Sequence, residues 1–218
     1  MQFAMNEIVS EFEKENDIKV ELIITSSGKL TSQIEQGAPF DVFVAANTKY
    51  PAYLDSLGLT TLPPKVYAHG KLGLWTLKEL SPTLALLTTD TIQKIAIANP
   101  KTAPYGKASI EALKHSGIYD QVKHKLVFGE SISQVNQFIT TGSVDIGFTA
   151  FSVISYIEMK AIGKCISINV NDHKKIEQAA VVIKSSTNMK EAKAFYNFLF
   201  SERAREILNK YGYLTPEK

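Results

Sequence analysis

The sequence has little cysteine, no excess of one charge and no long apolar run. Its single cysteine, Cys165, excludes an internal disulfide and a zinc site built from several cysteines. Lysine and arginine (24) nearly balance aspartate and glutamate (22), and a formal charge of +2 offers no basic surface for a nucleic acid. Apolar runs such as residues 84–87 are far shorter than the roughly 18 to 20 residues that span a bilayer. We therefore expect neither a nucleic acid partner nor a membrane span.

Glycine (12) and proline (8) are too few, and the apolar fraction of 44% is too high, for a disordered or collagen-like chain. A length of 218 residues allows one large domain or two small ones. The chain is therefore expected to be globular.

Apolar patterns with helical and strand periods alternate along the chain, which is typical of the α/β class. Helices are expected around residues 5–16, 30–36, 50–57, 108–115, 132–139 and after 188, and strands around 18–24, 41–45, 71–77, 95–98, 126–128, 144–148 and 179–183. Such alternation predicts mainly parallel sheets with flanking helices. The simplest architecture has two lobes, residues 1–77 plus 179–218 and residues 78–178, with a ligand cleft between them.

Three loops between a strand and a helix are candidates for a binding site, because ligands of open parallel sheets bind beyond the carboxyl ends of strands. Residues 25–28 offer three hydroxyls and, with Ser27 at the N-cap, free backbone N–H groups that suit an anion. Residues 104–106 and 130–132 form two further helix starts. Each loop alone is equally well explained by ordinary helix capping. Lys29, Lys101 and Lys107 lie in or beside the loops, but no arginine does.

Side chains that could act in catalysis are scattered along the sequence. His69, His115, His124 and His173 share no metal-binding spacing, and His115 and His124 are expected on the solvated surface. Cys165 is expected to be a buried, inert thiol. Trp75 is expected to pack in the core or at a hinge. We therefore expect no enzymatic activity and no cofactor.

Several collinear segments resemble the periplasmic molybdate-binding proteins of ABC uptake systems, a type II solute-binding family. The most specific is the run Gln-Ile-Glu-Gln-Gly-Ala-Pro-Phe-Asp at residues 33–41; residues 26–30, 99–106, 144–148 and 195–213 follow the family in order. The resemblance implies a two-lobed periplasmic-binding-protein-like fold that closes on a tetrahedral oxyanion, molybdate or tungstate. It also implies a monomer in the periplasm, a membrane permease as partner, and no directly coordinated metal cation.

The resemblance implies roles for individual residues. Ser27 would donate its hydroxyl and N–H to the oxyanion, with Ser26 beside it, and Tyr105 and Ile132 would donate backbone N–H groups. Ala150 stands where the family commonly has a tyrosine hydroxyl, which Thr149, Ser152 or a water would have to replace.

A second departure concerns the N-terminal part of the fold. The family begins with a strand and a hydroxyl-bearing loop, whereas this sequence opens within the first expected helix. We expect that the longer protein supplies this strand together with an export signal. For the sequence as it stands we expect weaker binding and lower stability.

Two other functions fit the same fold. One is the ligand-sensing module of a transcription regulator, which would need a helix-turn-helix segment. The other is an enzyme acting on an anionic substrate, which would need a convergent acid, base or nucleophile. Neither feature is found in the sequence.

Overall fold

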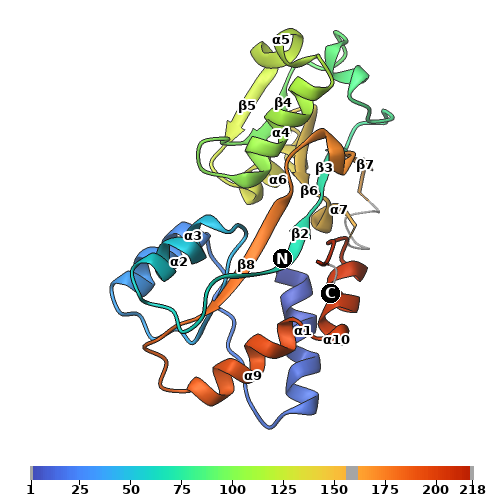
Figure 1. Ribbon diagram of the computed structural model, residues 1–218. Coiled ribbons are helices and arrows are strands. Elements are labelled where there is room, and N and C mark those ends of the chain that lie inside the picture. Colours follow the sequence, from blue (N-terminus) through green and yellow to red (C-terminus); the bar gives the residue numbers. More distant parts are fainter. Residues whose placement is uncertain (1, 156–161, 217–218) are drawn as a thin grey trace. The chain divides into compact units, whose positions relative to one another are not determined.

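The computed structural model describes residues 2–155 and 162–216 and divides the chain into two compact units (Figure 1). The first unit comprises Met1–His69 and Glu177–Lys218, and the second comprises Gly70–Ile176. The expected boundary near residue 77 lies too far along the chain, because strand β3 (Leu72–Thr76) is hydrogen-bonded into the sheet of the second unit. No helix in the described ranges is long and apolar enough to cross a membrane.

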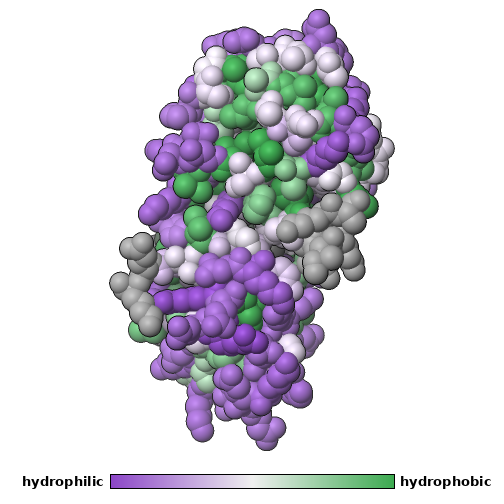
Figure 2. All heavy atoms as spheres, turned by 90° about the vertical axis from the view of Figure 1, so that its right-hand side faces the viewer, coloured by the Kyte–Doolittle hydropathy of each residue, from purple (hydrophilic) through white to green (hydrophobic). Residues whose placement is uncertain are grey.

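The first unit is built on a short sheet with helices around it. Its strand order is β1-β8-β2, and β1 is antiparallel to β8. Hydrophilic residues cover most of the face of this unit that is seen in the lower part of Figure 2. The elements of this unit are α1 (Gln2–Glu15), α2 (Ser27–Glu35), β1 (Val42–Val44), α3 (Lys49–Ser56), β2 (Lys65–Gly70), β8 (Ile176–Val182), α9 (Met189–Leu199) and α10 (Glu202–Lys210).

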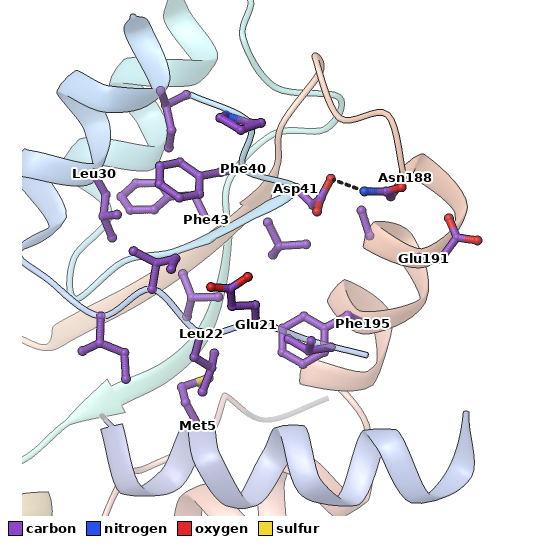
Figure 3. A pocket seen from close by; sticks show the side chains of 18 of the residues that line it. Met5, Glu21, Leu22, Leu30, Phe40, Asp41, Phe43, Asn188, Glu191 and Phe195 are labelled. Carbon is purple, nitrogen blue, oxygen red and sulfur yellow. Dashed lines mark hydrogen bonds between the residues drawn. The ribbon is translucent and has the colours of Figure 1, made fainter. Parts of the chain in front are cut away.

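The prediction of a strand at residues 18–24 is wrong. The segment is not part of any sheet in the described residues, although Ile18, Val20 and Leu22 pack against the core of the unit. A strand needs a hydrogen-bonded neighbour, and this segment borders a pocket instead (Figure 3). Alternating apolar residues are therefore present here without the ladder that would make them a strand.

Helix α1 packs its apolar stripe against helices from the other end of the chain. The apolar residues of one helix face recur at intervals of one to three residues and are buried, as the sequence predicts; they are Met5, Ile8, Val9 and Phe12. The Phe12 ring meets the Phe195 ring of α9 edge to face, with the ring centroids 5.3 Å apart. Burial of a large apolar side chain is worth roughly 1.5 to 3 kcal/mol, so this stripe is the main attachment of α1.

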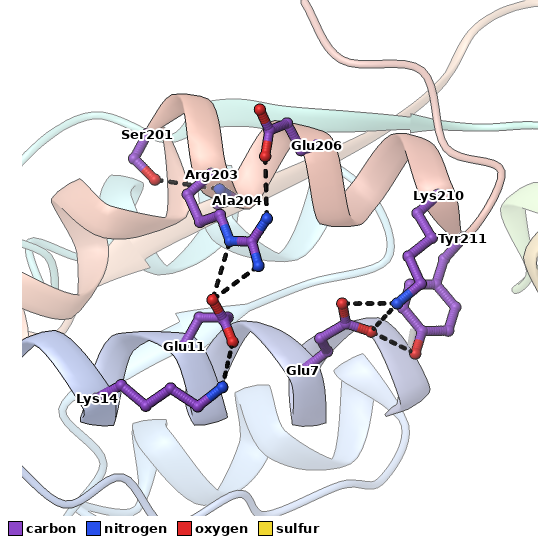
Figure 4. A network of polar contacts seen from close by, with 9 residues as sticks. All are labelled: Glu7, Glu11, Lys14, Ser201, Arg203, Ala204, Glu206, Lys210 and Tyr211. Atoms are coloured by element: carbon purple, nitrogen blue, oxygen red, sulfur yellow. Dashed lines mark hydrogen bonds and ion pairs between the residues drawn. The ribbon is translucent and has the colours of Figure 1, made fainter.

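Ion pairs border the contact between α1 and α10 (Figure 4). Glu7 accepts hydrogen bonds from Lys210 at 2.8 Å and from the Tyr211 hydroxyl at 2.8 Å. Glu11 accepts from the Arg203 guanidinium at 2.8 and 2.9 Å. Water screens exposed pairs of this kind, so they align the two helices more than they hold them together.

The second unit has a five-stranded sheet in the order β5-β4-β6-β3-β7. β4 is parallel to β5 and β6, whereas β3 is antiparallel to β6 and β7, so the sheets are mixed and not mainly parallel as expected. The parallel pairs β4–β5 and β4–β6 join strands that are linked through helices, as parallel geometry requires. The elements not yet given are β4 (Ile95–Ala98), α4 (Pro104–His115), α5 (Tyr119–Val122), β5 (Leu126–Gly129), α6 (Ile132–Thr140), β6 (Ile146–Ala150), α7 (Phe151–Ile154) and β7 (Lys164–Ser167).

Strand β4 explains how helices cover both faces of this sheet. Ile95 and Ile97 pack into one core cluster with residues of α4, and Ala96 and Ala98 pack into another with residues of α6. Successive side chains of a strand point to opposite faces, so α4 and α6 lie on opposite sides of the sheet. Both helices start at the carboxyl end of a parallel strand, which positions their N-termini at one edge.

Candidate functional site

The N-terminus of α2 carries the serines expected in the site of the first unit. Ser26, with φ −67° and ψ 142°, is the N-cap, and its hydroxyl oxygen accepts the Lys29 N–H at 3.3 Å. Ser27 is therefore the first helical residue and not the cap, which corrects our expectation. The N–H groups of Ser27 and Gly28 precede the first donors that reach an acceptor within the helix, so they point out of its end.

The side chain of Ser27 ties this helix end to the end of strand β1. Its hydroxyl oxygen accepts the Ala46 N–H at 3.2 Å. A hydroxyl that accepts one hydrogen bond still has its own O–H to donate. Ser27 can therefore offer both an O–H and an N–H to an anion.

Tyr50 of α3 is a further candidate for the binding site, and the sequence pattern did not indicate it. A Cβ atom added at Gly28 would lie 2.9 Å from the Tyr50 hydroxyl, so this hydroxyl lies against the N-terminus of α2. The contact joins residues from two helices and depends on Gly28 having no side chain. A sequence search for hydroxyls within the loops could not have found it.

Helix α4 opens directly above the end of strand β4. Pro104 occupies its first turn, where a missing N–H costs nothing, and Tyr105 follows, 6% exposed. A Cβ atom added at Gly106 would lie only 2.0 Å from the Ala98 carbonyl oxygen, so only glycine allows the helix to start this close to the strand. The backbone N–H groups of this first turn face away from the helix body.

Helix α6 opens beside it at the end of strand β5. Ser131 is the N-cap, as expected, and its hydroxyl oxygen accepts the Gln134 N–H at 3.2 Å. The Gln134 side chain in turn accepts the Glu130 N–H at 2.7 Å. These bonds hold the loop, and Ile132 as the first helical residue keeps its N–H outside the intrahelical ladder.

Ala150 ends strand β6, the third parallel strand, and is 5% exposed. The Phe151 N–H donates to the Lys71 carbonyl, on the side of β6 that faces β3. Successive N–H groups of a strand point to opposite sides, so the Ala150 N–H points toward the β4 side. The Thr149 hydroxyl is fully buried and donates to the Asn136 side chain, and Ser152 is 6% exposed. Thr149 therefore does not take the place of the family tyrosine in this structure.

The structure brings three of the expected site residues to one sheet edge. Tyr105, Ile132 and Ala150 lie at the carboxyl ends of β4, β5 and β6, which are mutually parallel through β4. The first two loops are directly joined, since the Asn99 N–H donates to the Gly129 carbonyl at 2.7 Å. Ser26 and Ser27 belong to the first unit, and their meeting with this edge remains a prediction.

Charged side chains around this edge are solvent-exposed. Lys101 and Lys107 flank the start of α4, and the carboxylate of Glu130 lies just before α6. Charges in contact with water are strongly screened. Backbone amides and helix ends therefore determine the chemistry of the edge, which favours an anion over a cation.

Residues for catalysis are not gathered in the part of the chain that the structure describes. His115 is exposed, as expected, with its Nδ1 3.2 Å from Asp172, whereas His173 is buried and bonds its own neighbour's carbonyl. Cys165 is half-buried in β7, not fully buried, and Trp75 is a core residue. In the same described ranges no three His, Cys, Asp or Glu side chains are placed to hold a metal ion.

An α/β chain in two units, with helix starts at the carboxyl ends of its strands, has the architecture of a solute-binding protein. The chain belongs to the family of bacterial extracellular solute-binding proteins, whose family model matches residues 1–214. It is therefore a binding protein and not an enzyme.

Several individual members of this family are similar to the chain. The molybdate-binding protein ModA of Azotobacter vinelandii is 36% identical over 212 residues, covering 96% of this chain and 84% of the relative. ModA of Rhodobacter capsulatus is 39% identical over 192 residues, covering 87% of this chain and 75% of the relative. The solved periplasmic molybdate-binding protein of A. vinelandii superimposes with a TM-score of 0.89 at 32% identity, covering 99% of this chain and 96% of that one.

Proposed function

We propose that this protein binds molybdate or tungstate outside the cytoplasm and delivers the ion to the membrane permease of an ABC transporter. The names of the relatives support this ligand, and the family supports the location. Molybdenum or tungsten would enter only within the bound oxyanion, so the protein needs no metal ligand of its own.

The observation that carries the proposal is the pair of helix starts at adjacent strand ends of the second unit. α4 and α6 direct backbone N–H groups and the positive ends of their dipoles to one sheet edge. Both arginines of the chain, Arg203 and Arg205, lie on α10. A doubly negative oxyanion would therefore be held by neutral donors, which become charge-assisted hydrogen bonds when it arrives.

The proposed donors come from both units. Ser27 would donate its O–H and N–H, and Tyr105 and Ile132 would donate backbone N–H groups. Ser26 would hold the start of α2 and place its own O–H beside the ion. Ala150 would line the site and contribute no side-chain donor. These roles rest on the helix positions of the residues and on the family resemblance.

Neutral donors in a closed pocket favour a guest that fits the pocket. Molybdate and tungstate have nearly the same size and charge, whereas sulfate and phosphate are smaller. We therefore expect both larger oxyanions to bind well, and sulfate to bind about 100-fold more weakly or worse, a difference of about 2.7 kcal/mol.

Calorimetric titration with the four anions, one at a time and at constant ionic strength, tests the proposal. Molybdate and tungstate should give saturable heats with one ion per chain. Equal affinity for all four anions would refute selection by size. No binding of molybdate or tungstate, with sulfate or phosphate bound, would refute the proposed ligand.

A further inference from the structure

Two helices of the first unit pack against each other and fix the place of Tyr50. Helices α2 and α3 lie side by side (Figure 1), with Ile34 of α2 and Leu54 of α3 buried in the same apolar cluster. Leu30 and Tyr50 pack against that cluster. The Tyr50 ring is therefore held between the two helices, while its backbone belongs to the first turn of α3.

The tip of the Tyr50 ring reaches the start of α2. A Cβ atom added at Gly28 would lie 2.9 Å from the Tyr50 hydroxyl oxygen and 3.2 Å from the Cζ atom that carries it. Gly28 is the second residue of α2, and the Cα–Cβ bonds of a helix tilt toward its N-terminus. The hydroxyl therefore lies toward the N-terminal end of α2, the direction in which the free N–H groups of Ser27 and Gly28 also point.

A short loop after β1 holds Ser27 and Tyr50 in place together. The Ala46 N–H donates to the Ser27 hydroxyl oxygen at 3.2 Å. The next residue, Asn47, accepts the Tyr50 N–H on its side-chain oxygen at 3.2 Å. The same piece of backbone thus anchors the start of α2 and the start of α3, which keeps the two side chains in a fixed relation.

The Tyr50 hydroxyl is available to a ligand. Among the residues that the structure describes, none forms a hydrogen bond with it. Its oxygen reaches solvent, and the residue as a whole is half-buried. The other tyrosine of α3, Tyr53, instead donates its hydroxyl to the Glu35 carboxylate at 2.8 Å. Tyr50 therefore keeps an O–H that can be donated to a guest.

The surroundings of this hydroxyl favour a negative guest. Neither α2 nor α3 has an acidic residue in its first turn. The positive end of the α2 dipole lies beside the hydroxyl. The Lys49 ammonium lies 5.6 Å from the centre of the Tyr50 ring. An anion here would meet hydrogen-bond donors and positive charge, and no carboxylate from either first turn.

We propose that the Tyr50 hydroxyl is a further donor to the bound oxyanion, beside Ser27. This inference rests on the proposed function, because it adds one contact to the same site. Tyr50 donates from α3, whereas Ser27 and the backbone donate from the start of α2. Gly28 belongs to this arrangement, since a side chain at that position would displace the Tyr50 hydroxyl.

Tyr50→Phe tests the proposal because it removes only the hydroxyl. Phenylalanine keeps the ring that packs between the helices and the ring face near Lys49. The urea midpoint without ligand should hardly change, since no described residue loses a hydrogen bond. The dissociation constant for molybdate, measured by calorimetry, should rise about tenfold or more, the scale of a lost hydrogen bond to a charged partner.

Tyr53→Phe is the matched control for this change. It removes a hydroxyl from the same helix, but this hydroxyl is bonded to Glu35. We expect its affinity for molybdate to equal that of the parent protein. The comparison thus separates the loss of the hydroxyl beside Gly28 from the loss of any tyrosine hydroxyl of α3.

Gly28→Ala tests the same contact from the other helix. Its Cβ atom would lie 2.9 Å from the Tyr50 hydroxyl oxygen, so the hydroxyl must move. We expect weaker molybdate binding in the parent protein and a clearly smaller loss in the Tyr50→Phe protein, where no hydroxyl is left to displace. Equal losses in both proteins would contradict the proposed contact.

Calorimetry of the parent protein distinguishes failure of this inference from failure of the proposed function. If the parent binds neither molybdate nor tungstate, the proposed function fails and Tyr50 has no such oxyanion to contact. If the parent binds molybdate and Tyr50→Phe binds it equally tightly, the proposed function stands and the role of Tyr50 is overturned. A Tyr50→Phe protein whose unfolding free energy falls by as much as its binding free energy would also overturn it, because the hydroxyl would then support the fold.

Discussion

Replacing Ser27 with alanine removes one side-chain oxygen at the start of α2 and separates the proposed ligand role of this residue from its structural role. The hydroxyl oxygen accepts the Ala46 N–H at 3.2 Å, and Ala46 is exposed, so water replaces this bond. The cost in unfolding free energy is therefore at the low end of about 0.5 to 1.5 kcal/mol. A lost hydrogen bond to a doubly charged oxyanion costs more, about 1 to 3 kcal/mol, or about 5- to 150-fold in the dissociation constant.

Ser201→Ala is the matched control for this change. Ser201 caps α10 in the same unit, and its hydroxyl oxygen accepts the Ala204 N–H at 3.1 Å. Losing this cap costs about 1 kcal/mol of stability and leaves the affinity for molybdate unchanged. Calorimetry and urea unfolding are run on both variants. A Ser27→Ala protein that binds molybdate as tightly as the parent would remove Ser27 from the binding site.

Two further changes test the fold around the proposed site and the contact between the terminal helices. Gly106→Ala sets a Cβ atom 2.0 Å from the Ala98 carbonyl oxygen, and we expect the unfolding free energy to fall by about 1 to 3 kcal/mol, seen as a lower urea midpoint. The hydrogen bond from Lys210, with Tyr211, lowers the pKa of Glu7 below its ordinary value despite some burial. The contribution of Glu7 to stability is therefore complete above that ordinary value, near pH 4.5, and is lost as the pH falls through the lowered pKa. Glu7→Gln should accordingly cost stability at pH 7 and almost none near pH 2, in urea midpoints taken across this range.

For each of these two predictions, a specific result would contradict the reasoning. An unchanged midpoint for Gly106→Ala would mean that the start of α4 can move away from β4. A stability difference between Glu7→Gln and the parent that stays constant down to pH 2 would mean that the Glu7 carboxylate is not held ionised by its partners.

Helix positions were predictable from the sequence because each depends on local patterns. The apolar stripe around Met5 and Phe12 defined α1, and the loop at residues 130–132 marked the start of α6. Strand β4 was also predictable from its short apolar run, which matches residues 95–98. The positions of Tyr105 and Ile132 at helix starts were therefore predictable, whereas their role as donors to an anion stays a prediction.

Other features depend on partners that are distant in the chain. Residues 18–24 have the period of a strand, but a ladder requires a neighbour that the pattern does not contain. β2 has only a weak pattern, and its pairing with β8 joins residues more than a hundred positions apart. The contact of Tyr50 with Gly28 depends in the same way on how α3 packs against α2.

The first unit is made from both ends of the chain, whereas the second is one continuous stretch. On the ribosome, the second unit can therefore complete its core while the C-terminal residues are still being added. α1 must wait, because Phe195 and the rest of α9 and α10 follow the second unit in the chain. The apolar stripe of α1 is thus uncovered while the second unit is being synthesised, and it exposes apolar surface until α9 and α10 have been made.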